Sequence, residues 1–160
     1  MGSQSKINLA YIAGFLDGDG SLMIQIKKRK DAKSGVRIML TVCFYQDSRH
    51  AEPLIWIRRI LGIGYISERN DGITELRING FEQIYRILKD LTLYLKFKKK
   101  QALAIFKAAE ILKDKKRKKE LDQKDLRKLI NCIMVVQTNN YATKSKKKKE
   151  DLFKILGLTP

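Results

Sequence analysis

The sequence predicts an α+β fold in which helices cover one face of a curved antiparallel sheet and leave its other face open. Two observations predict this fold: the changing period of the apolar residues and the length of the chain. Apolar residues first recur at three- and four-residue intervals, then alternate in two pairs of segments, and then return to the helical period. The expected order is helix, strand, strand, helix, strand, strand, then helices, and the chain is long enough to bury a core.

A single domain is expected over residues 1–160, because domains of this size are common. Within it, residues 1–5 are interpreted as a flexible or added N-terminal stretch. Residues 137–160 are interpreted as a basic loop followed by a C-terminal helix.

The first helix is predicted over residues 7–17, with Gly18 and Gly20 expected to end it. The first hairpin is predicted from residues 22–29 and 36–45, which are joined by a polar turn. In both strands the even positions are apolar, so one face of this hairpin should meet the core.

A second helix is predicted at residues 50–61, with Pro53 in its first turn. The sequence Asn70-Asp71-Gly72 indicates a tight turn between two further strands. These strands are expected at 64–69 and 73–79, and later helices at 81–95, 99–113, 123–136 and about 150–156. Asp122 is the expected N-cap of the helix at 123–136. The basic block at 115–119 is interpreted as a solvated run, with nuclear targeting as a weaker alternative.

The charge of the chain indicates a nucleic-acid partner. Lys and Arg number 34 and Asp and Glu 17, for a net charge of +17, and self-repulsion of that size needs an external partner. An anionic membrane is the alternative, but it requires a basic amphipathic helix with exposed aromatic residues. The only Trp, Trp56, lies in a stretch typical of a core, so no membrane partner is expected.

Two carboxylates mark the candidate for chemistry. Asp17 and Asp19 stand at the expected end of the first helix, where partial negative charge makes acids unfavourable unless a cation joins them. Asp19 and the Gly18 carbonyl offer hard oxygen ligands suited to Mg²⁺. An EF-hand is excluded, because the sixth and twelfth positions from Asp17 are Leu22 and Lys28 instead of Gly and Glu. The four residues from Asp17 to Gly20 are equally compatible with a simple polar turn.

From Ile12 to Gly20, the sequence resembles the defining motif of the LAGLIDADG homing endonucleases, with Ile12 in place of the leading Leu. The resemblance extends over nearly the whole chain in the order of its elements. It implies that two motif helices pack together at the centre of an assembly. Because this chain carries one motif, it implies a homodimer with a near-palindromic DNA target. The expected interface residues are Tyr11, Ile12, Gly14 and Phe15.

By this resemblance, Asp19 is the essential metal ligand, the Gly18 carbonyl assists it, and Asp17 braces the helix end. The implied cofactor is Mg²⁺, with Mn²⁺ as an alternative and Ca²⁺ as a non-catalytic substitute. The ion activates water and stabilises the leaving 3′ oxygen during phosphodiester hydrolysis.

Three more positions match the family's solvent-ordering pocket. Gln46 is implied to orient the attacking water, and Lys98 to polarise water or stabilise the scissile phosphate. Four residues beyond Gln46, where close relatives carry Arg or Lys, this chain has His50. Two interpretations of His50 are equally supported: a residue of the catalytic pocket, or an exposed polar residue at the start of a helix.

DNA contacts are expected on the open sheet face and in the late basic loop. There Arg could read guanine, Gln25 adenine and Glu75 cytosine, while Lys side chains neutralise phosphates. The candidates are Met23, Gln25, Lys27, Arg29, Arg37, Met39, Thr41, Cys43, Tyr65, Ser67, Arg69, Glu75, Arg77, Lys144 and Lys146.

The function implied is a homodimeric, sequence-specific homing endonuclease that hydrolyses both strands of DNA at a long near-palindromic site and leaves short 3′ overhangs. The main alternative is a non-cleaving binder on the same scaffold, either a maturase acting on its own intron RNA or a DNA-binding regulator. A ribosomal-type RNA-binding protein is more distant. The excess of 24 Lys over 10 Arg favours an AT-rich genome. The expected location is intracellular, because the N-terminus lacks the regions of a signal peptide, and the composition favours a mitochondrion, a chloroplast or a prokaryotic cytoplasm.

Overall fold

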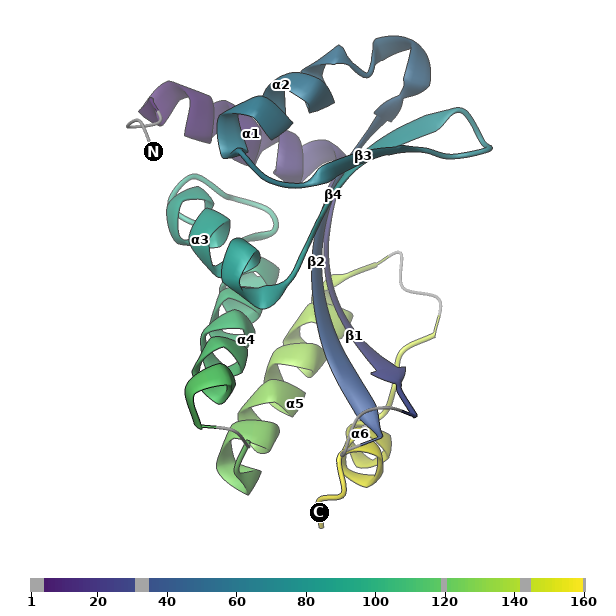
Figure 1. Ribbon diagram of the computed structural model, residues 1–160, viewed down its shortest axis with the longest axis vertical. Coiled ribbons are helices and arrows are strands. Elements are labelled where there is room, and N and C mark those ends of the chain that lie inside the picture. Colours follow the sequence, from purple (N-terminus) through teal and green to yellow (C-terminus); the bar gives the residue numbers. More distant parts are fainter. Residues whose placement is uncertain (1–4, 31–34, 119–120, 142–144, 160) are drawn as a thin grey trace.

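The computed structural model in Figure 1 describes residues 5–30, 35–118, 121–141 and 145–159. Its helices are α1 (Lys6–Asp19), α2 (Glu52–Leu61), α3 (Phe81–Leu91), α4 (Lys99–Lys118), α5 (Gln123–Asn139) and α6 (Lys149–Ile155), with a one-turn helix η1 (Ser48–His50). Its strands are β1 (Gly20–Lys28), β2 (Val36–Asp47), β3 (Tyr65–Glu68) and β4 (Ile73–Asn79). The predicted α+β order of elements is confirmed.

The four strands form one antiparallel sheet in the order β1-β2-β4-β3. Gly20 pairs with Phe44 at one end of the first hairpin, and Lys28 pairs with Val36 at the other. The second hairpin joins the sheet through the pairing of β2 with β4. In Figure 1 the long β1–β2 hairpin curves through the molecule with α3, α4 and α5 on one side, as the sequence predicts.

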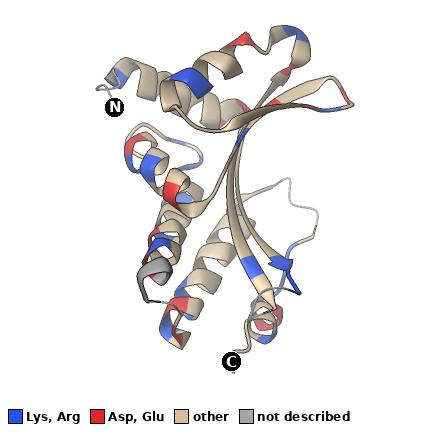
Figure 2. Ribbon diagram, in the orientation of Figure 1, with Lys and Arg blue, Asp and Glu red and all other residues tan. Residues whose placement is uncertain are grey.

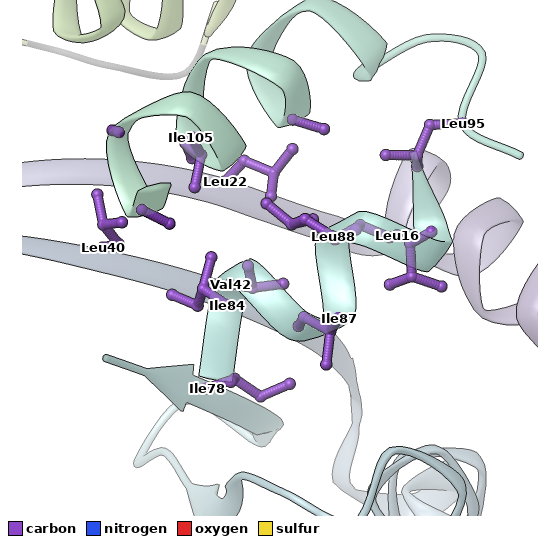
Figure 3. Close-up of a cluster of buried hydrophobic side chains, with 14 of the residues drawn as sticks. Leu16, Leu22, Leu40, Val42, Ile78, Ile84, Ile87, Leu88, Leu95 and Ile105 are labelled. Atoms are coloured by element: carbon purple, nitrogen blue, oxygen red, sulfur yellow. The ribbon is translucent and has the colours of Figure 1, made fainter. Parts of the chain in front are cut away.

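The core lies between the sheet and these helices. Even-numbered strand residues, such as Leu22, Leu40 and Val42, point toward Leu88 and Ile105 of the helical layer (Figure 3). A smaller apolar cluster joins α5 to α6 and includes Ile133 and Phe153. Strict alternation along the strands therefore puts every even side chain of the hairpin centre into the core and turns every odd one to the opposite face.

Several helix boundaries differ from the predictions, including the ends of α1, α3, α4 and α5. α1 continues through Gly18 to Asp19, and β1 begins at the next residue, so no loop separates the motif helix from the sheet. α3 ends at Leu91, earlier than expected, and residues 92–98 form an irregular connection. α4 continues into the basic block as far as Lys118, because Lys and Arg are good helix formers and the block contains no Gly or Pro.

Two local signals are confirmed. Asp122 caps α5 by accepting a hydrogen bond from the Asp125 backbone N–H at 2.7 Å. Pro53 lies in the first turn of α2, where a missing N–H costs nothing. No helix in the part of the chain that the structure describes is long and apolar enough to cross a membrane.

Candidate active site

The direct junction between α1 and β1 sets the position of the acidic residues. The junction depends on Gly20, because a Cβ there would lie 2.7 Å from the Leu16 carbonyl oxygen and 2.9 Å from the Leu16 Cα. The chain thus turns from helix to strand within one residue. Asp17, Gly18 and Asp19 form the last turn of the helix beside the first residues of the sheet.

Asp17 holds the connection between α3 and α4. Its carboxylate accepts three backbone hydrogen bonds, from Lys96 at 2.6 Å, Phe97 at 3.2 Å and Lys98 at 2.9 Å. Three consecutive N–H groups converge on one carboxylate, which satisfies donors that precede the first turn of α4. This geometry makes Asp17 a bracing residue and leaves it little capacity to bind a metal ion.

The Lys98 side chain in turn binds the end of α1. Its ammonium donates to the carbonyl oxygens of Asp17 at 2.6 Å, Leu16 at 2.9 Å and Gly18 at 3.4 Å. Burial lowers the pKa of this ammonium from its usual value, while the charges of Asp17 and Asp19 act in the opposite direction. Asp17 and Lys98 thus form a reciprocal clamp between the end of α1 and the start of α4.

Asp19 differs from Asp17 in the hydrogen bonding of its carboxylate, although its charge also acts on the Lys98 ammonium. Within the described ranges it accepts no hydrogen bond, and it belongs to no cluster of three or more His, Cys, Asp or Glu side chains that could hold a metal ion. An exposed carboxylate next to the Gly18 carbonyl fits Mg²⁺, which keeps several waters and needs few protein ligands. A metal ion at this position would need further ligands from outside the described residues.

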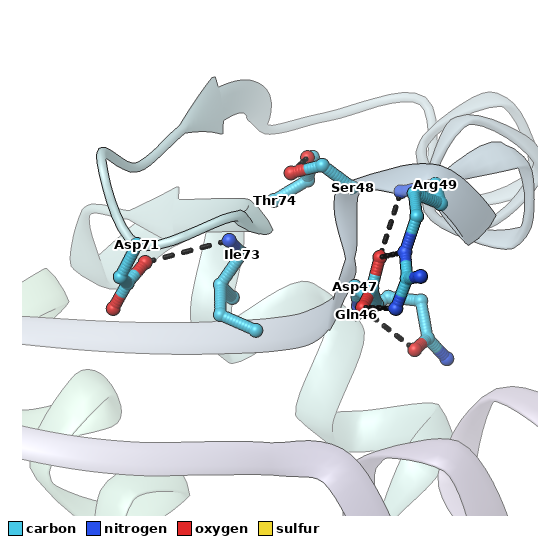
Figure 4. Close-up of polar contacts among 7 residues, drawn as sticks. All are labelled: Gln46, Asp47, Ser48, Arg49, Asp71, Ile73 and Thr74. Atoms are coloured by element: carbon cyan, nitrogen blue, oxygen red, sulfur yellow. Dashed lines mark hydrogen bonds and ion pairs between the residues drawn. The ribbon is translucent and has the colours of Figure 1, made fainter.

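Gln46 and His50 come from the end of β2 and from the one-turn helix η1 that follows it. Gln46 follows Phe44, the partner of Gly20, by two residues, so β2 carries it to the end of α1. Its Oε1 accepts from the Asp47 backbone N–H at 2.9 Å (Figure 4). His50 ends η1 and is exposed, and the structure shows no hydrogen bond that joins it to Asp19, Gln46 or Lys98 among the described residues.

An ion pair occupies the corner next to these residues. The Arg49 guanidinium binds both oxygens of the Asp47 carboxylate, at 2.9 and 2.8 Å, as Figure 4 shows. The hydrogen bonds from Arg49 hold the pKa of Asp47 well below its usual value. Arg49 therefore neutralises Asp47, whereas the Asp19 carboxylate has no ion pair or hydrogen bond among the described residues.

Polar side chains at the centre of the open face bind one another. Thr41 donates to Asn79 Oδ1 at 2.8 Å, and Asn79 Nδ2 donates to the Tyr65 hydroxyl at 3.3 Å. Arg77 pairs with Glu75 at 3.0 Å. Nearer to the acidic residues, the Ser21 and Tyr45 hydroxyls share a hydrogen bond of 2.9 Å.

The expected DNA contacts at Thr41, Cys43 and Glu75 need correction. Cross-strand pairing puts them on the open face, but Thr41 and Cys43 are buried and Glu75 is only 7% exposed. The larger neighbours Tyr45 and Arg77 stand beside them, so these three residues form the floor of the face rather than its accessible surface.

The periphery of the open face remains accessible. Gln25 pairs with Met39 and Lys27 with Arg37, and the basic members of this region gather toward the hairpin tip in Figure 2. The other expected contacts vary in exposure: Met23, Met39, Ser67 and Arg77 are half-buried, whereas Arg29, Tyr65, Arg69 and Lys146 are exposed. Arg69 pairs with Asp71 at 2.6 Å. Lys144 lies outside the described residues.

The α5–α6 connection is anchored at both ends. Asn140 Nδ2 donates to the Leu22 carbonyl at 2.9 Å, which ties the start of the connection to the edge strand β1. Gln137 accepts from the Lys147 backbone N–H at 2.8 Å and holds its end. These two hydrogen bonds hold residues 140 and 147, one at each end of the connection.

One side of α1 is only partly covered by the described residues, where the Tyr11 ring meets the edge of Trp56 with centroids 5.5 Å apart. Ile7 and Tyr11 are exposed and line an apolar groove of about 340 Å³ with Asn8, Pro53 and Trp56. A Cβ at Gly14 would meet no atom within 4 Å. The connection between α3 and α4, which Asp17 holds, carries two more exposed apolar side chains. These are Leu93 and Phe97, which are 72% and 85% exposed.

Ile12 needs a second correction. The resemblance places it at a subunit interface, but its side chain is 0% exposed and lies in the core of its own chain. Phe15 is half-buried and packs against Phe44, with ring centroids 6.2 Å apart. The i, i+4 and i+7 spacing of Ile7, Tyr11 and Gly14 defines the exposed side of the helix instead.

Sequence reasoning missed several polar residues of the site. Ser21, Tyr45 and Asn79 occupy the odd positions that the alternation assigns to the open face, so the period of two could have found them. Gln137 and Asn140 had no such signal, because their partners lie in distant segments of the chain.

Sequence comparisons relate the chain to known DNA endonucleases. A sequence profile of the LAGLIDADG endonuclease family matches residues 12–112. The chain is 36% identical over 113 residues to DNA endonuclease I-CvuI of Chlorella vulgaris, which is 69% of each protein. It is 32% identical over 108 residues to DNA endonuclease I-CreI of Chlamydomonas reinhardtii, covering 68% of this chain and 66% of that one.

Solved structures extend the match to nearly the whole chain. The crystal structure of I-CvuI in complex with its target in the presence of Ca aligns with a TM-score of 0.79 at 25% identity, covering 97% of this chain and 98% of that one. The archaeal intron-encoded homing endonuclease I-Vdi141I, in complex with DNA, shares the fold with a TM-score of 0.79 at 23% identity, over 94% of this chain and 95% of that one. The profile match, the identity and the shared architecture together show that the chain belongs to the LAGLIDADG endonuclease family.

Proposed function

We propose that the chain is a sequence-specific DNA homing endonuclease that acts as a homodimer and hydrolyses one phosphodiester per strand with a divalent cation. The observation that carries this proposal is the state of Asp19. Its carboxylate is exposed at the negative end of α1 and accepts no hydrogen bond among the described residues, so it is available to a divalent cation beside the Lys98 ammonium, which contacts the backbone carbonyls of the same helix end. A protein that only binds DNA has no need of such an acid.

Asp19 and the Gly18 carbonyl would hold Mg²⁺, and the bound ion would supply Lewis-acid activation of water and stabilisation of the leaving oxygen. Mn²⁺ has similar ligand chemistry. The chain's own residues would position the reactants: Gln46 would orient water beside the junction, and Lys98 would face the phosphate. His50 is exposed and next to Arg49, and we assign it to a contact with the phosphate backbone.

DNA recognition would divide between two parts of the surface. The odd-numbered residues of the β1–β2 hairpin, with Gln25, Lys27 and Arg37 the most exposed, would enter the major groove, which admits a two-stranded ribbon. Lys146 and the adjacent lysines would follow the phosphates. The Lys- and Ile-rich composition supports an organellar gene, and membership of the endonuclease family supports an intron as its carrier.

The direct test uses the targets of the two algal relatives, doped at every position with the other bases, and sequences the ends cut in Mg²⁺. We expect recovered ends to define one near-palindromic site with short 3′ overhangs, and cutting to stop in EDTA. If duplexes are selected by binding but never cut in Mg²⁺ or Mn²⁺, the chain is a non-cleaving binder instead.

The homodimer can be tested at Gly14. Because a Cβ there meets nothing within 4 Å of its own chain, Gly14→Leu should leave the monomer fold intact and act only on a second copy of α1. We expect sedimentation to show a dimer for the native chain and a monomer that no longer cuts for Gly14→Leu. Lys107→Leu, on the exposed side of α4, is the matched control and should remain a dimer. An active monomer would contradict the proposed symmetry.

A further inference from the structure

We propose that the Lys98 ammonium is the built-in counter-ion of α1, which occupies the negative end of this helix in the DNA-free chain and yields the Gly18 carbonyl to the divalent cation. This inference rests on the proposed function for the cation site, and it gives Lys98 a task before any DNA is bound.

The end of α1 needs a positive charge that the helix itself lacks. Its last turn contains no basic residue and contains both Asp17 and Asp19. Helices usually close their last carbonyls with a following loop or with Lys, Arg or His in the final turn. α1 has neither, because β1 starts at Gly20, directly after the helix.

Lys98 fills this place from 79 residues further along the chain, counting from Asp19. Its Nζ lies within 3.4 Å of three successive carbonyl oxygens, those of residues 16, 17 and 18. An ammonium has three donors and no acceptor, so one side chain can satisfy all three. Lys96, Lys99 and Lys100 are exposed, so the arrangement selects Lys98 among its lysine neighbours.

The clamp explains how Lys98 reaches this position. Asp17 fixes the backbone N–H groups of residues 96–98, from which the Lys98 side chain extends back over the helix end. The carboxylate and the ammonium therefore stabilise each other's placement without forming the usual direct ion pair. Each binds the backbone of the other's segment.

The Lys98 ammonium and the divalent cation compete for the carbonyl oxygen of Gly18. Gly18 O makes the longest of the three contacts, at 3.4 Å, and it is the oxygen that adjoins Asp19. Two positive ions at one carbonyl repel strongly at such separations. Ion binding at Asp19 and Gly18 must therefore move the ammonium off Gly18, which frees it to approach a phosphate. The contacts to Leu16 and Asp17 limit how far it travels.

The test needs no DNA. We expect Lys98→Met to lower Tm by about 4–8 °C, the upper range for a charge at a partly buried helix terminus in a chain of this size. Lys96→Met, in the same connection but with an exposed side chain, should leave Tm unchanged. Both proteins are measured at the same protein concentration, because oligomerisation also shifts Tm.

Calcium affinity separates a counter-ion from a merely structural side chain. By calorimetry, Lys98→Met should bind Ca²⁺ roughly tenfold more tightly than the native chain, the effect that one neighbouring charge has on the proton affinity of a carboxyl group. Ca²⁺ should also restore more of the Tm of Lys98→Met than it adds to the native chain. Adding Asp19→Asn to Lys98→Met should remove this response.

Equal Ca²⁺ affinity in Lys98→Met and the native chain, or equal Tm in Lys98→Met and Lys96→Met, would overturn the proposal. If Lys98→Met does not fold, Lys98→Gln retains a hydrogen-bond donor without the charge and should show the same tightening of Ca²⁺ binding. A failure of the proposed nuclease activity would be seen in a different experiment, the cleavage selection, which uses no Lys98 variant.

Discussion

Asp19→Asn should reduce DNA cleavage at least about a thousandfold, since a metal ion contributes several kcal/mol to such a transition state and each 1.4 kcal/mol is about tenfold. The amide is neutral and binds a divalent cation poorly. No nearby acid can replace the carboxylate, because Asp17 is occupied by three backbone N–H groups. Asp47 is bound by Arg49 on both oxygens.

The measurement is single-turnover cleavage of the selected site, with binding followed separately by gel shift in Ca²⁺. DNA binding by Asp19→Asn should persist, because phosphate contacts from Lys and Arg supply most of the affinity. Its Tm should not fall, since the native carboxylate accepts no hydrogen bond within the described chain. Asp17→Asn is the informative contrast and should lower Tm, because it loses a charged acceptor of backbone donors. Undiminished cutting by Asp19→Asn would reject the assignment of Asp19.

Gly20→Ala should destabilise the fold by roughly 2–4 kcal/mol, at the upper end for an overpacked position. The added Cβ would lie 2.5 Å from Leu16 Cδ1, which can move, but also 2.7 Å from Leu16 O and 2.9 Å from Leu16 Cα, which cannot move without shifting the helix. For a chain of this length, we expect Tm to fall by about 5–15 °C.

Gly18→Ala is the matched control for stability. A Cβ at Gly18 meets no atom within 4 Å, and Ala is the better helix former, so Tm should stay the same or rise slightly. Scanning calorimetry at one protein concentration compares the two variants. Equal Tm values for them would show that the junction between α1 and β1 tolerates a side chain.

The sheet could be predicted from the sequence because its signals are local. The alternation in residues 22–29 and 36–45 sets which side chains meet the core, and Asn-Asp-Gly at 70–72 marks the second hairpin. The pairing of β2 with β4 joins these hairpins as an antiparallel sheet. The same alternation put Thr41 and Cys43 on the correct face, but it does not predict which residues of that face are covered.

The helix ends could not be predicted because their causes are distant. Glycine at position 18 indicated a stop, yet α1 continues to Asp19, where Lys98 caps the exposed carbonyls in place of a loop. Ile12 was misplaced for a similar reason. Helical spacing gives the apolar side of a helix, but only packing shows which residues the chain keeps for its own core.

The missing loop after α1 has a consequence for redesigning the DNA target. Without a flexible hinge, a rotation of α1 passes directly into β1 and so into the strand expected to read bases. Substitutions at Ser21 or Met23, within four residues of Asp19, should therefore alter turnover together with base preference. Lys27 and Arg37, which pair with each other near the hairpin tip, are far enough along the strands to change preference alone. Retargeting should start at that tip and proceed toward the helix.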